Sequence, residues 1–189
     1  MAIFARLERF TSASYYRHDS LTGRLQQVIQ DIYHATADGL SLTIPAGSTL
    51  PASGAANATT DYQHDAFGRI TQVLGPAHTA DVSGTPTSIR AASWTFYNDA
   101  AHETRHAQGY ALAASPYTET IVGPISITRT DRDGRTTGQI QAAYNGTLAN
   151  LPSAAISQSD YTAWTTYQYT KTRLVSSRVY DDIPASGSG

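Results

Sequence analysis

The sequence contains no cysteine among its 189 residues, so neither disulfide bonds nor thiolate metal sites can hold the fold together. Charged residues are also sparse, at 15%, and the formal net charge is -2. Such a chain has no basic field that would attract phosphate groups, which argues against nucleic acid and anionic membrane surfaces as partners. Because the lack of cysteine fits both secreted and cytosolic proteins, it does not settle the compartment.

Long hydrophobic runs are missing as well. No apolar stretch approaches the roughly 20 residues that span a bilayer, so no membrane span is predicted. The opening residues, Met1 to Arg6, lack the apolar core of a signal peptide, and any export signal is expected outside this segment. We find no glycine-rich phosphate loop, no serine nucleophile elbow and no identifiable partner for Glu103 or Glu119. No residue is therefore assigned to catalysis or to a cofactor.

Tyrosine dominates the aromatic residues, with 12 Tyr against 4 Phe and 2 Trp. Tyrosine and threonine favour half-buried strands, and 40% hydrophobic residues suffice for a core. Stretches rich in small and polar residues predict four loop connectors, roughly at 43–60, 75–90, 109–124 and 141–160. The chain is therefore expected to be a single unit of five denser segments, around 15–29, 61–74, 94–108, 125–140 and 164–180.

The five segments share one signature, Tyr-x-x-Asp-x-x-Gly-Arg followed by an apolar residue, and repeat it roughly every 30 to 45 residues. The clearest copy is Tyr62, Asp65, Gly68, Arg69 and Ile70. An earlier copy with one extra turn residue is Tyr16, Asp19, Gly23, Arg24 and Leu25. The later copies are looser: Phe96, Asp99, His102, Glu103 and Thr104; then Thr128, Asp131, Gly134, Arg135 and Thr136; and finally Tyr167, Thr170, Arg173 and Leu174, with one position deleted.

The signature has a physical basis in the β-hairpin. An aspartate that opens a tight turn accepts hydrogen bonds from backbone N–H groups further on, and glycine supplies the positive φ that closes a bulged hairpin. The flanking residues then become paired strands, and three or more such hairpins must stack because one alone is marginal in water. The sequence therefore predicts an all-β fold of antiparallel hairpin repeats forming part of a twisted sheet, with turns near Asp19, Asp65, Asp131 and, more weakly signalled, Asp99 and Thr170.

These residues resemble the tyrosine/aspartate (YD) repeats of Rhs proteins, teneurins and the shells of large bacterial insecticidal toxins. The resemblance is carried by Tyr62 to Ile70, Tyr16 to Leu25, and Thr165 to Tyr169 with Arg173 to Val175. It implies a long β-sheet wound into a hollow shell that encloses or displays a C-terminal effector. The chain is then a partial segment of a larger secreted or cell-surface bacterial protein, and its partners are neighbouring repeats and the effector domain. We find no counterpart of the paired aspartate-proline motifs of Rhs self-cleavage, so autoproteolysis is not implied.

One motif supports a different function. His102-Glu103-Thr104-Arg105-His106 matches H-E-x-x-H, which on a helix places two imidazoles around zinc with the glutamate as general base of a metallopeptidase. Periodicity allows a helix over 98–108, although Leu112 stands where the longer form of the motif has its third histidine. The repeat register instead puts His102 in the glycine position of a turn and the rest on a strand, where residues four apart lie roughly 13 Å apart. We therefore predict no metal site.

Other local patterns have competing interpretations. Hydrophobic periodicity predicts a helix over 24–34, whereas the family resemblance predicts a strand. The stretch Asp131 to Gly134 is similar to the opening of a calcium loop, but the bidentate glutamate downstream is missing and the repeat explains it as a turn. His18 and His64 both stand directly before a repeat aspartate, which indicates a structural role.

Two function classes follow. The first is a structural wall segment that is not an enzyme in its own right. The second is a carbohydrate-binding or cell-surface-binding module, in which exposed tyrosines and Trp94 or Trp164 stack on glycans. The terminal strands, around 11–17 and 173–180, are neither short nor strongly charged, so we expect unpaired edges through which the isolated chain self-associates.

Overall fold

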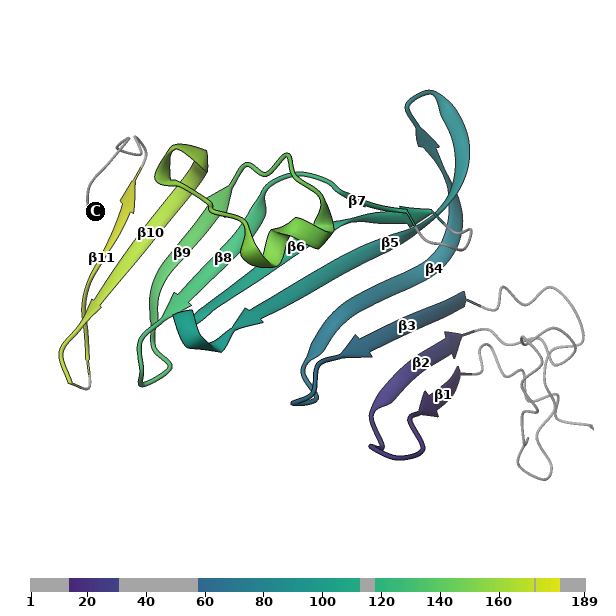
Figure 1. Ribbon diagram of the computed structural model, residues 1–189, viewed down its shortest axis with the longest axis horizontal. Coiled ribbons are helices and arrows are strands. Elements are labelled where there is room, and N and C mark those ends of the chain that lie inside the picture. Colours follow the sequence, from purple (N-terminus) through teal and green to yellow (C-terminus); the bar gives the residue numbers. More distant parts are fainter. Residues whose placement is uncertain (1–13, 31–57, 113–117, 172, 181–189) are drawn as a thin grey trace, which may run out of the picture.

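The computed structural model describes residues 14–30, 58–112, 118–171 and 173–180 (Figure 1). Within these ranges all strands belong to one eleven-stranded sheet, and every strand pair is antiparallel. The strands are β1 (Ser14–His18), β2 (Leu25–Gln30), β3 (Ala58–His64), β4 (Ile70–Val82), β5 (Thr85–Asn98), β6 (Glu103–Leu112), β7 (Glu119–Ile121), β8 (Ile125–Thr130), β9 (Thr136–Ala142), β10 (Tyr161–Tyr169) and β11 (Leu174–Tyr180). The predicted all-β, antiparallel fold is confirmed.

The only helical elements in the described ranges are three short 3-10 helices: η1 (Asp99–Ala101), η2 (Leu148–Ser153) and η3 (Gln158–Asp160). None of the described helices is long and apolar enough to cross a membrane. The stretch 24–34, for which periodicity predicted a helix, forms β2 over Leu25–Gln30, and its last four residues lie outside the described ranges.

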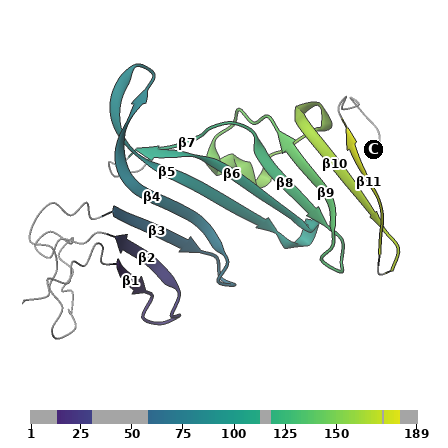
Figure 2. The ribbon, with the colours of Figure 1, turned by 180° about the vertical axis from the view of Figure 1, so that it is seen from behind.

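Strand order follows chain order, because each hairpin lies beside the one before it. The path runs β1-β2-β3-β4-β5-β6-β8-β9-β10-β11, and β7 pairs with the later part of β6, next to the stretch that pairs with β8. The turns after β1, β3, β5, β8 and β10 all lie along one edge of the sheet, the lower edge in Figure 1, and the view from behind in Figure 2 shows the same row. We call these five turns the turn row. They are the turns of the five repeat segments.

The predicted connector at 75–90 is wrong, because β4 and β5 run on through it as a two-stranded ribbon that projects from the edge opposite the turn row (Figure 1). The register shifts between Leu74 and Ala77 and then continues to the pair of Val82 and Thr85. Ser83 and Gly84 close the ribbon with φ of 54 and 82, the two positive angles of a type I′ turn. The composition of this segment predicted a loop because many of its residues are small or polar.

The predicted connector at 109–124 is also partly wrong. β6 continues to Leu112, and β7 pairs with it from Glu119 to Ile121. Gly109 is needed for this pairing: a Cβ placed there would collide with the carbonyl oxygen of Thr120. The glycine therefore permits a close approach of backbones and does not mark a loop. In the connector at 43–60, residues 58–60 belong to β3 and the others lie outside the described ranges.

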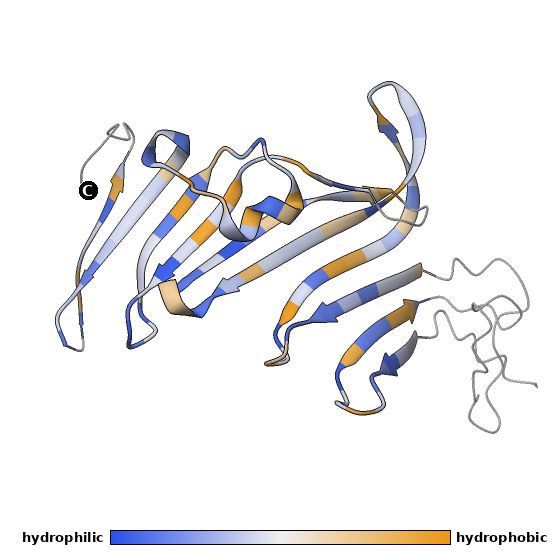
Figure 3. Cartoon of the chain, viewed as in Figure 1, coloured by the Kyte–Doolittle hydropathy of each residue, from blue (hydrophilic) through white to orange (hydrophobic). Residues whose placement is uncertain are grey.

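One face of the sheet carries the core. Residues 143–160, with η2 and η3, cross this face in front of β6 and β8 (Figure 1); we call this segment the cover. Hydrophobic positions alternate with polar ones along β8 and β9 (Figure 3), and the hydrophobic side chains lie beneath the cover. The core cluster consists of Leu74, Ala92, Trp94, Ala107, Ala111, Ile125, Ile127, Ile140, Ala142 and Leu151. We call the other side of the sheet the open face.

Candidate functional site

The turn row is the candidate site, because it gathers most of the residues that define the repeats. In the second hairpin, Asp65 Oδ1 accepts hydrogen bonds from the backbone N–H groups of Phe67 and Arg69, both at 2.9 Å. Gly68, at φ 86, donates its N–H to the Asp65 carbonyl at 3.0 Å. The fourth hairpin repeats this geometry around Asp131, with bonds of 2.9 and 3.0 Å to its Oδ1. Both turns have the predicted aspartate-glycine form.

The remaining turns are variants of this form. Asp19 spans one extra residue and accepts from Thr22 N and Oγ1 at 2.7 and 2.8 Å, while Gly23 adopts φ 69. In the third turn η1 replaces the simple bend, and His102 takes the positive-φ position at φ 51. The fifth turn closes through the N–H of Thr170, which donates to the Arg173 carbonyl at 2.9 Å.

The repeat arginines link one turn to the next. Arg24, at the exit of the first turn, donates from Nη1 to the Asp65 carbonyl at 2.7 Å and from Nη2 to the Ala66 carbonyl at 2.9 Å. Arg69, at the exit of the second turn, grips both carboxylate oxygens of Asp99 at 2.6 and 3.0 Å. A guanidinium suits this role because its fork holds several fixed donors.

Arg135 repeats the pattern further along the sheet. Its Nη1 donates to the carbonyls of Thr170 and Lys171, at 3.2 and 2.9 Å, in the turn of the fifth hairpin. Its Nε donates to Asp131 of its own turn at 2.7 Å. We call the set of Arg24, Arg69 and Arg135, with the turns they reach, the arginine ladder.

The ladder changes form between the third and fourth hairpins, where Glu103 stands in the position of the arginine. The third turn is held to β8 by Thr130, whose N–H donates to the His102 carbonyl at 2.9 Å. The Glu103 side chain lies on the covered face of the sheet, and the residue has an exposed fraction of 9%. It pairs with Arg105 at 2.7 Å and with Arg129 at 2.9 Å. Arg105 also donates to the carbonyls of Leu151 and Ala154, which fastens the cover to the sheet.

The sequence offered no identifiable partner for Glu103 or Glu119, and the structure corrects this. Glu103 pairs with Arg105 on its own strand and with Arg129 on β8. Glu119 accepts a hydrogen bond from Gln72 Nε2 at 2.9 Å. Burial raises the pKa of the Glu103 carboxyl, but the hydrogen bonds and charges of Arg105 and Arg129 outweigh it and leave that pKa below its ordinary value. Glu103 is therefore held as a carboxylate.

The repeat tyrosines Tyr16, Tyr62 and Tyr167 lie on the strands that lead into the turn row. Tyr16 is 58% exposed on β1, and Tyr62 is half-buried on β3. The Tyr167 hydroxyl donates to Gln139 Oε1 at 2.8 Å, across neighbouring strands. Tyr97, next to the position of the repeat aromatic, lies under the Arg69 guanidinium at 4.0 Å from ring centroid to Cζ.

A first prediction concerns the turn glycines. Gly134→Val is expected to lower the free energy of unfolding by about 1 to 3 kcal/mol, because a β-branched side chain is strained at its φ of 78 although open space surrounds it. Gly68→Val should cost more, because its Cβ would also press on the Arg24 guanidinium, 3.1 Å away. Urea unfolding measures both, and Ala66→Val is the control. Equal shifts at Gly134 and Ala66 would refute the turn assignment.

A second prediction concerns acid. The hydrogen bond from Arg69 lowers the pKa of Asp99, and that from Arg135 lowers the pKa of Asp131. A depressed folded pKa contributes stability that is present above the unfolded value of about 3.9 and is lost as the pH falls through the folded value. The free energy of unfolding should therefore fall below about pH 4. Asp99→Asn should reduce this fall, whereas Asp81→Asn, at the ribbon tip, should not; equal acid profiles for all three proteins would contradict the ladder.

The structure overturns the helical interpretation of the H-E-x-x-H motif. His102 lies in the turn, and Glu103 to His106 lie on β6, so the two imidazoles are not one helical turn apart. His106 contributes Nδ1 to a 3.2 Å hydrogen bond with Thr95 Oγ1, and Glu103 is occupied by two arginines. Within the described residues no group of three or more His, Asp or Glu side chains is placed to hold a metal ion.

A third prediction follows from this geometry. The purified chain is expected to carry zinc only at the level of the buffer, since His102 in the turn and His106 on the extended β6 are not one helical turn apart, as bonds of about 2.1 Å to one metal would require. Elemental analysis of the wild-type chain and of His102→Ala measures this. One zinc per chain, lost in His102→Ala, would restore the peptidase hypothesis.

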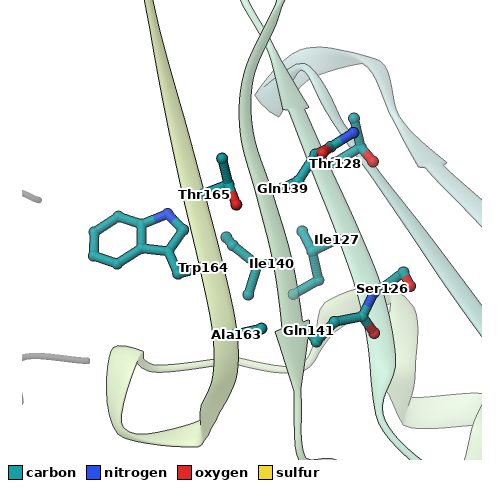
Figure 4. A pocket seen from close by; sticks show the side chains of 9 residues that line it. All are labelled: Ser126, Ile127, Thr128, Gln139, Ile140, Gln141, Ala163, Trp164 and Thr165. Carbon is teal, nitrogen blue, oxygen red and sulfur yellow. Dashed lines mark hydrogen bonds between the residues drawn. The ribbon is translucent and has the colours of Figure 1, made fainter. Parts of the chain in front are cut away.

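A shallow hollow lies on the open face between β8, β9 and β10 (Figure 4). Hydroxyl and amide side chains line it, and Gln141 Nε2 donates to Ser126 Oγ at 2.7 Å. Of the two tryptophans predicted as sugar platforms, Trp164 is among the residues that line this hollow and Trp94 is not. Trp94 is buried in the core with 3% exposed, and Trp164 stacks on Tyr180 with ring centroids 4.7 Å apart. The prediction of an exposed Trp94 is therefore wrong.

No family model matches the chain, and no curated protein matches it in sequence.

Proposed function

We propose that this chain is a structural wall segment of a larger secreted or cell-surface bacterial protein, built from repeats that resemble YD repeats, and that the wall encloses or displays an effector. The observation that carries the proposal is the arginine ladder. The arginines of the ladder each join one turn to the next by hydrogen bonds. The hairpins lie in the sheet in the order in which they follow one another in the sequence.

Further support comes from the way the strands are used. β1 and β11 each pair on one side only within the described residues, so the row of hairpins ends in unpaired edges. A sheet of this kind grows by addition of similar hairpins, as repeat proteins do. Such a row suits a wall that further repeats of the same polypeptide continue.

The coding sequence on both sides of this segment tests the proposal. We expect further copies of the tyrosine-aspartate-glycine-arginine signature in the same reading frame, followed by a C-terminal region of different composition. A reading frame that starts at Met1 and stops after Gly189 would contradict the wall role.

A carbohydrate-binding module is the second candidate, and the hollow of Figure 4 favours it. Ser126, Thr128, Gln139, Gln141 and Thr165 offer hydroxyl and amide groups there, the kind that hydrogen-bond sugars. A glycan array with the whole chain, repeated with Gln139→Ala, tests this function. Specific binding that Gln139→Ala abolishes would support it, and an array without specific binding would leave the wall role alone.

A further inference from the structure

At the β11 end of the sheet, Arg173 holds the position of a ladder arginine but has no next turn to contact within the described residues. Arg173 follows the fifth turn as Arg24 follows the first, and it is exposed. It makes no side-chain hydrogen bond or ion pair within the described residues, and Thr170 replaces the aspartate of its own turn. The strand that follows, β11, also exposes apolar side chains, with Val175 at 61% and Val179 at 70%.

The other end of the sheet has the complementary vacancy. In the first turn, Asp19 and Ser20 hold the repeat positions of Asp65 and Ala66, whose carbonyls accept from Arg24. The Asp19 carbonyl accepts from Gly23 N, as the Asp65 carbonyl accepts from Gly68 N. Within the described residues, no arginine side chain donates a hydrogen bond to the first turn, and Asp19 accepts from Leu21, Thr22, Gly23 and Gln26. β1 forms the edge beside this turn, and its Tyr16 is 58% exposed.

We propose that two copies of this chain associate head to tail, with β11 of one copy pairing antiparallel with β1 of the next and Arg173 donating to the first turn of that copy. In the part of the chain that the structure describes, the Arg173 guanidinium at one end of the sheet has no neighbouring turn to donate to. At the other end of that part, the first turn has no neighbouring arginine side chain that donates to it. The interface is heterologous, so it leaves a free edge at each end and propagates into chains of molecules. It depends on the ladder and not on the wall role.

The ladder also predicts the register of the pairing. Gln27 pairs with Asp61, and Gly138 pairs with Thr166, at the paired positions nearest the turns. Continued three residues beyond these pairs, the two registers set Arg24 opposite His64 and Arg135 opposite Tyr169, the residues directly before the turns of the neighbouring hairpins. The same rule puts Arg173 of one copy opposite His18 of the next.

Two residues further along the strands, this register places Val175 opposite Tyr16. Following the paired positions strand by strand across the sheet puts Tyr16 on the open face and Ser176 on the covered face. Val175 lies at the shift in register between β10 and β11, and alternation with the neighbouring Ser176 assigns its side chain to the open face. The predicted contact therefore joins two exposed, largely apolar side chains on the same side of the extended sheet, in the position where a cross-strand pair stabilises it.

Cysteine cross-linking tests the register, because the natural chain has no cysteine. Tyr16→Cys and Val175→Cys chains are mixed, oxidised and run on a non-reducing gel, and we expect a disulfide-linked dimer. The matched control replaces Val175→Cys by Ser176→Cys, whose side chain points to the other face of the same strand. A dimer yield no higher than this control, or cross-linking of Val175→Cys chains to one another as the main product, would overturn the head-to-tail pairing.

Sedimentation of the whole chain over a range of concentrations tests the association itself. Arg173→Ala is expected to weaken it about tenfold, the effect of losing charge-assisted hydrogen bonds, while Arg178→Ala on the same strand changes it less than about twofold. Circular dichroism confirms that each variant keeps its β structure. A wild-type chain that stays monomeric at every concentration would refute the second-copy interface and would leave the wall role standing, because that role needs only hairpins of the same polypeptide.

Discussion

Replacing Leu151 with alanine is expected to lower the free energy of unfolding by about 2 to 5 kcal/mol, the cost of removing buried methyl groups and leaving a cavity. Leu151 has no exposed surface and is the residue of η2 that enters the core. Its carbonyl also accepts from Arg105 Nη1 at 2.7 Å. The loss should therefore loosen the cover as well as the core.

Urea unfolding of Leu151→Ala measures this effect, and Leu21→Ala is its control, because Leu21 is 93% exposed at the tip of the first turn. The control should change the free energy of unfolding by less than about 0.5 kcal/mol. Equal losses in the two variants would mean that residues 143–160 do not cover the sheet.

Glu103→Ala is expected to destabilise the chain by about 3 kcal/mol, because it leaves two arginines without their shared carboxylate in a largely buried place. The cost lies at the lower end of the range for buried pairs, since the Arg129 side chain is 42% exposed whereas that of Arg105 is only 14% exposed. The variant should also expose the cover to proteolysis, because Arg105 fastens it.

The matched control is Glu119→Ala, since Glu119 is exposed and has a single neutral partner in Gln72. Thermal unfolding compares the two variants, and Glu103→Ala should melt several degrees lower than Glu119→Ala. A smaller shift for Glu103→Ala than for Glu119→Ala would show that the arginines do not depend on the buried carboxylate.

The hairpin turns could be predicted from the sequence because each depends on residues close together in the chain. Asp65 and Gly68 lie three positions apart, and their turn is made by hydrogen bonds within that distance. The position of His102 followed from the same local register, and its positive φ is confirmed. Local chemistry therefore carries the repeat and decides between strand and helix at the H-E-x-x-H motif.

The contacts between repeats could not be predicted in the same way. Arg24 and Asp65 lie far apart in the sequence, so the link between them depends on which hairpins become neighbours. The same holds for Arg129, the partner of Glu103 on β8, which lies in the next hairpin. Trp94 looked like a surface aromatic because nothing near it in the sequence shows that the cover lies over its face of the sheet.

The β4–β5 ribbon was missed for a different physical reason. Its strands are rich in Ala, Ser and Thr, and the prolines at 76 and 86 are residues that usually interrupt strands. A two-stranded ribbon has free edges that tolerate proline, and the Ser83-Gly84 pair supplied the one local signal of its turn. Composition alone does not separate such a ribbon from a loop.

The most direct measurement of the wall role is a cryo-electron microscopy map of the natural polypeptide that contains this segment. We expect five consecutive hairpins within a longer continuous sheet, with the rest of the polypeptide held or displayed by the wall. A map in which the β1 and β11 edges are closed by unrelated domains, or pair with each other to close this segment on itself, would contradict it.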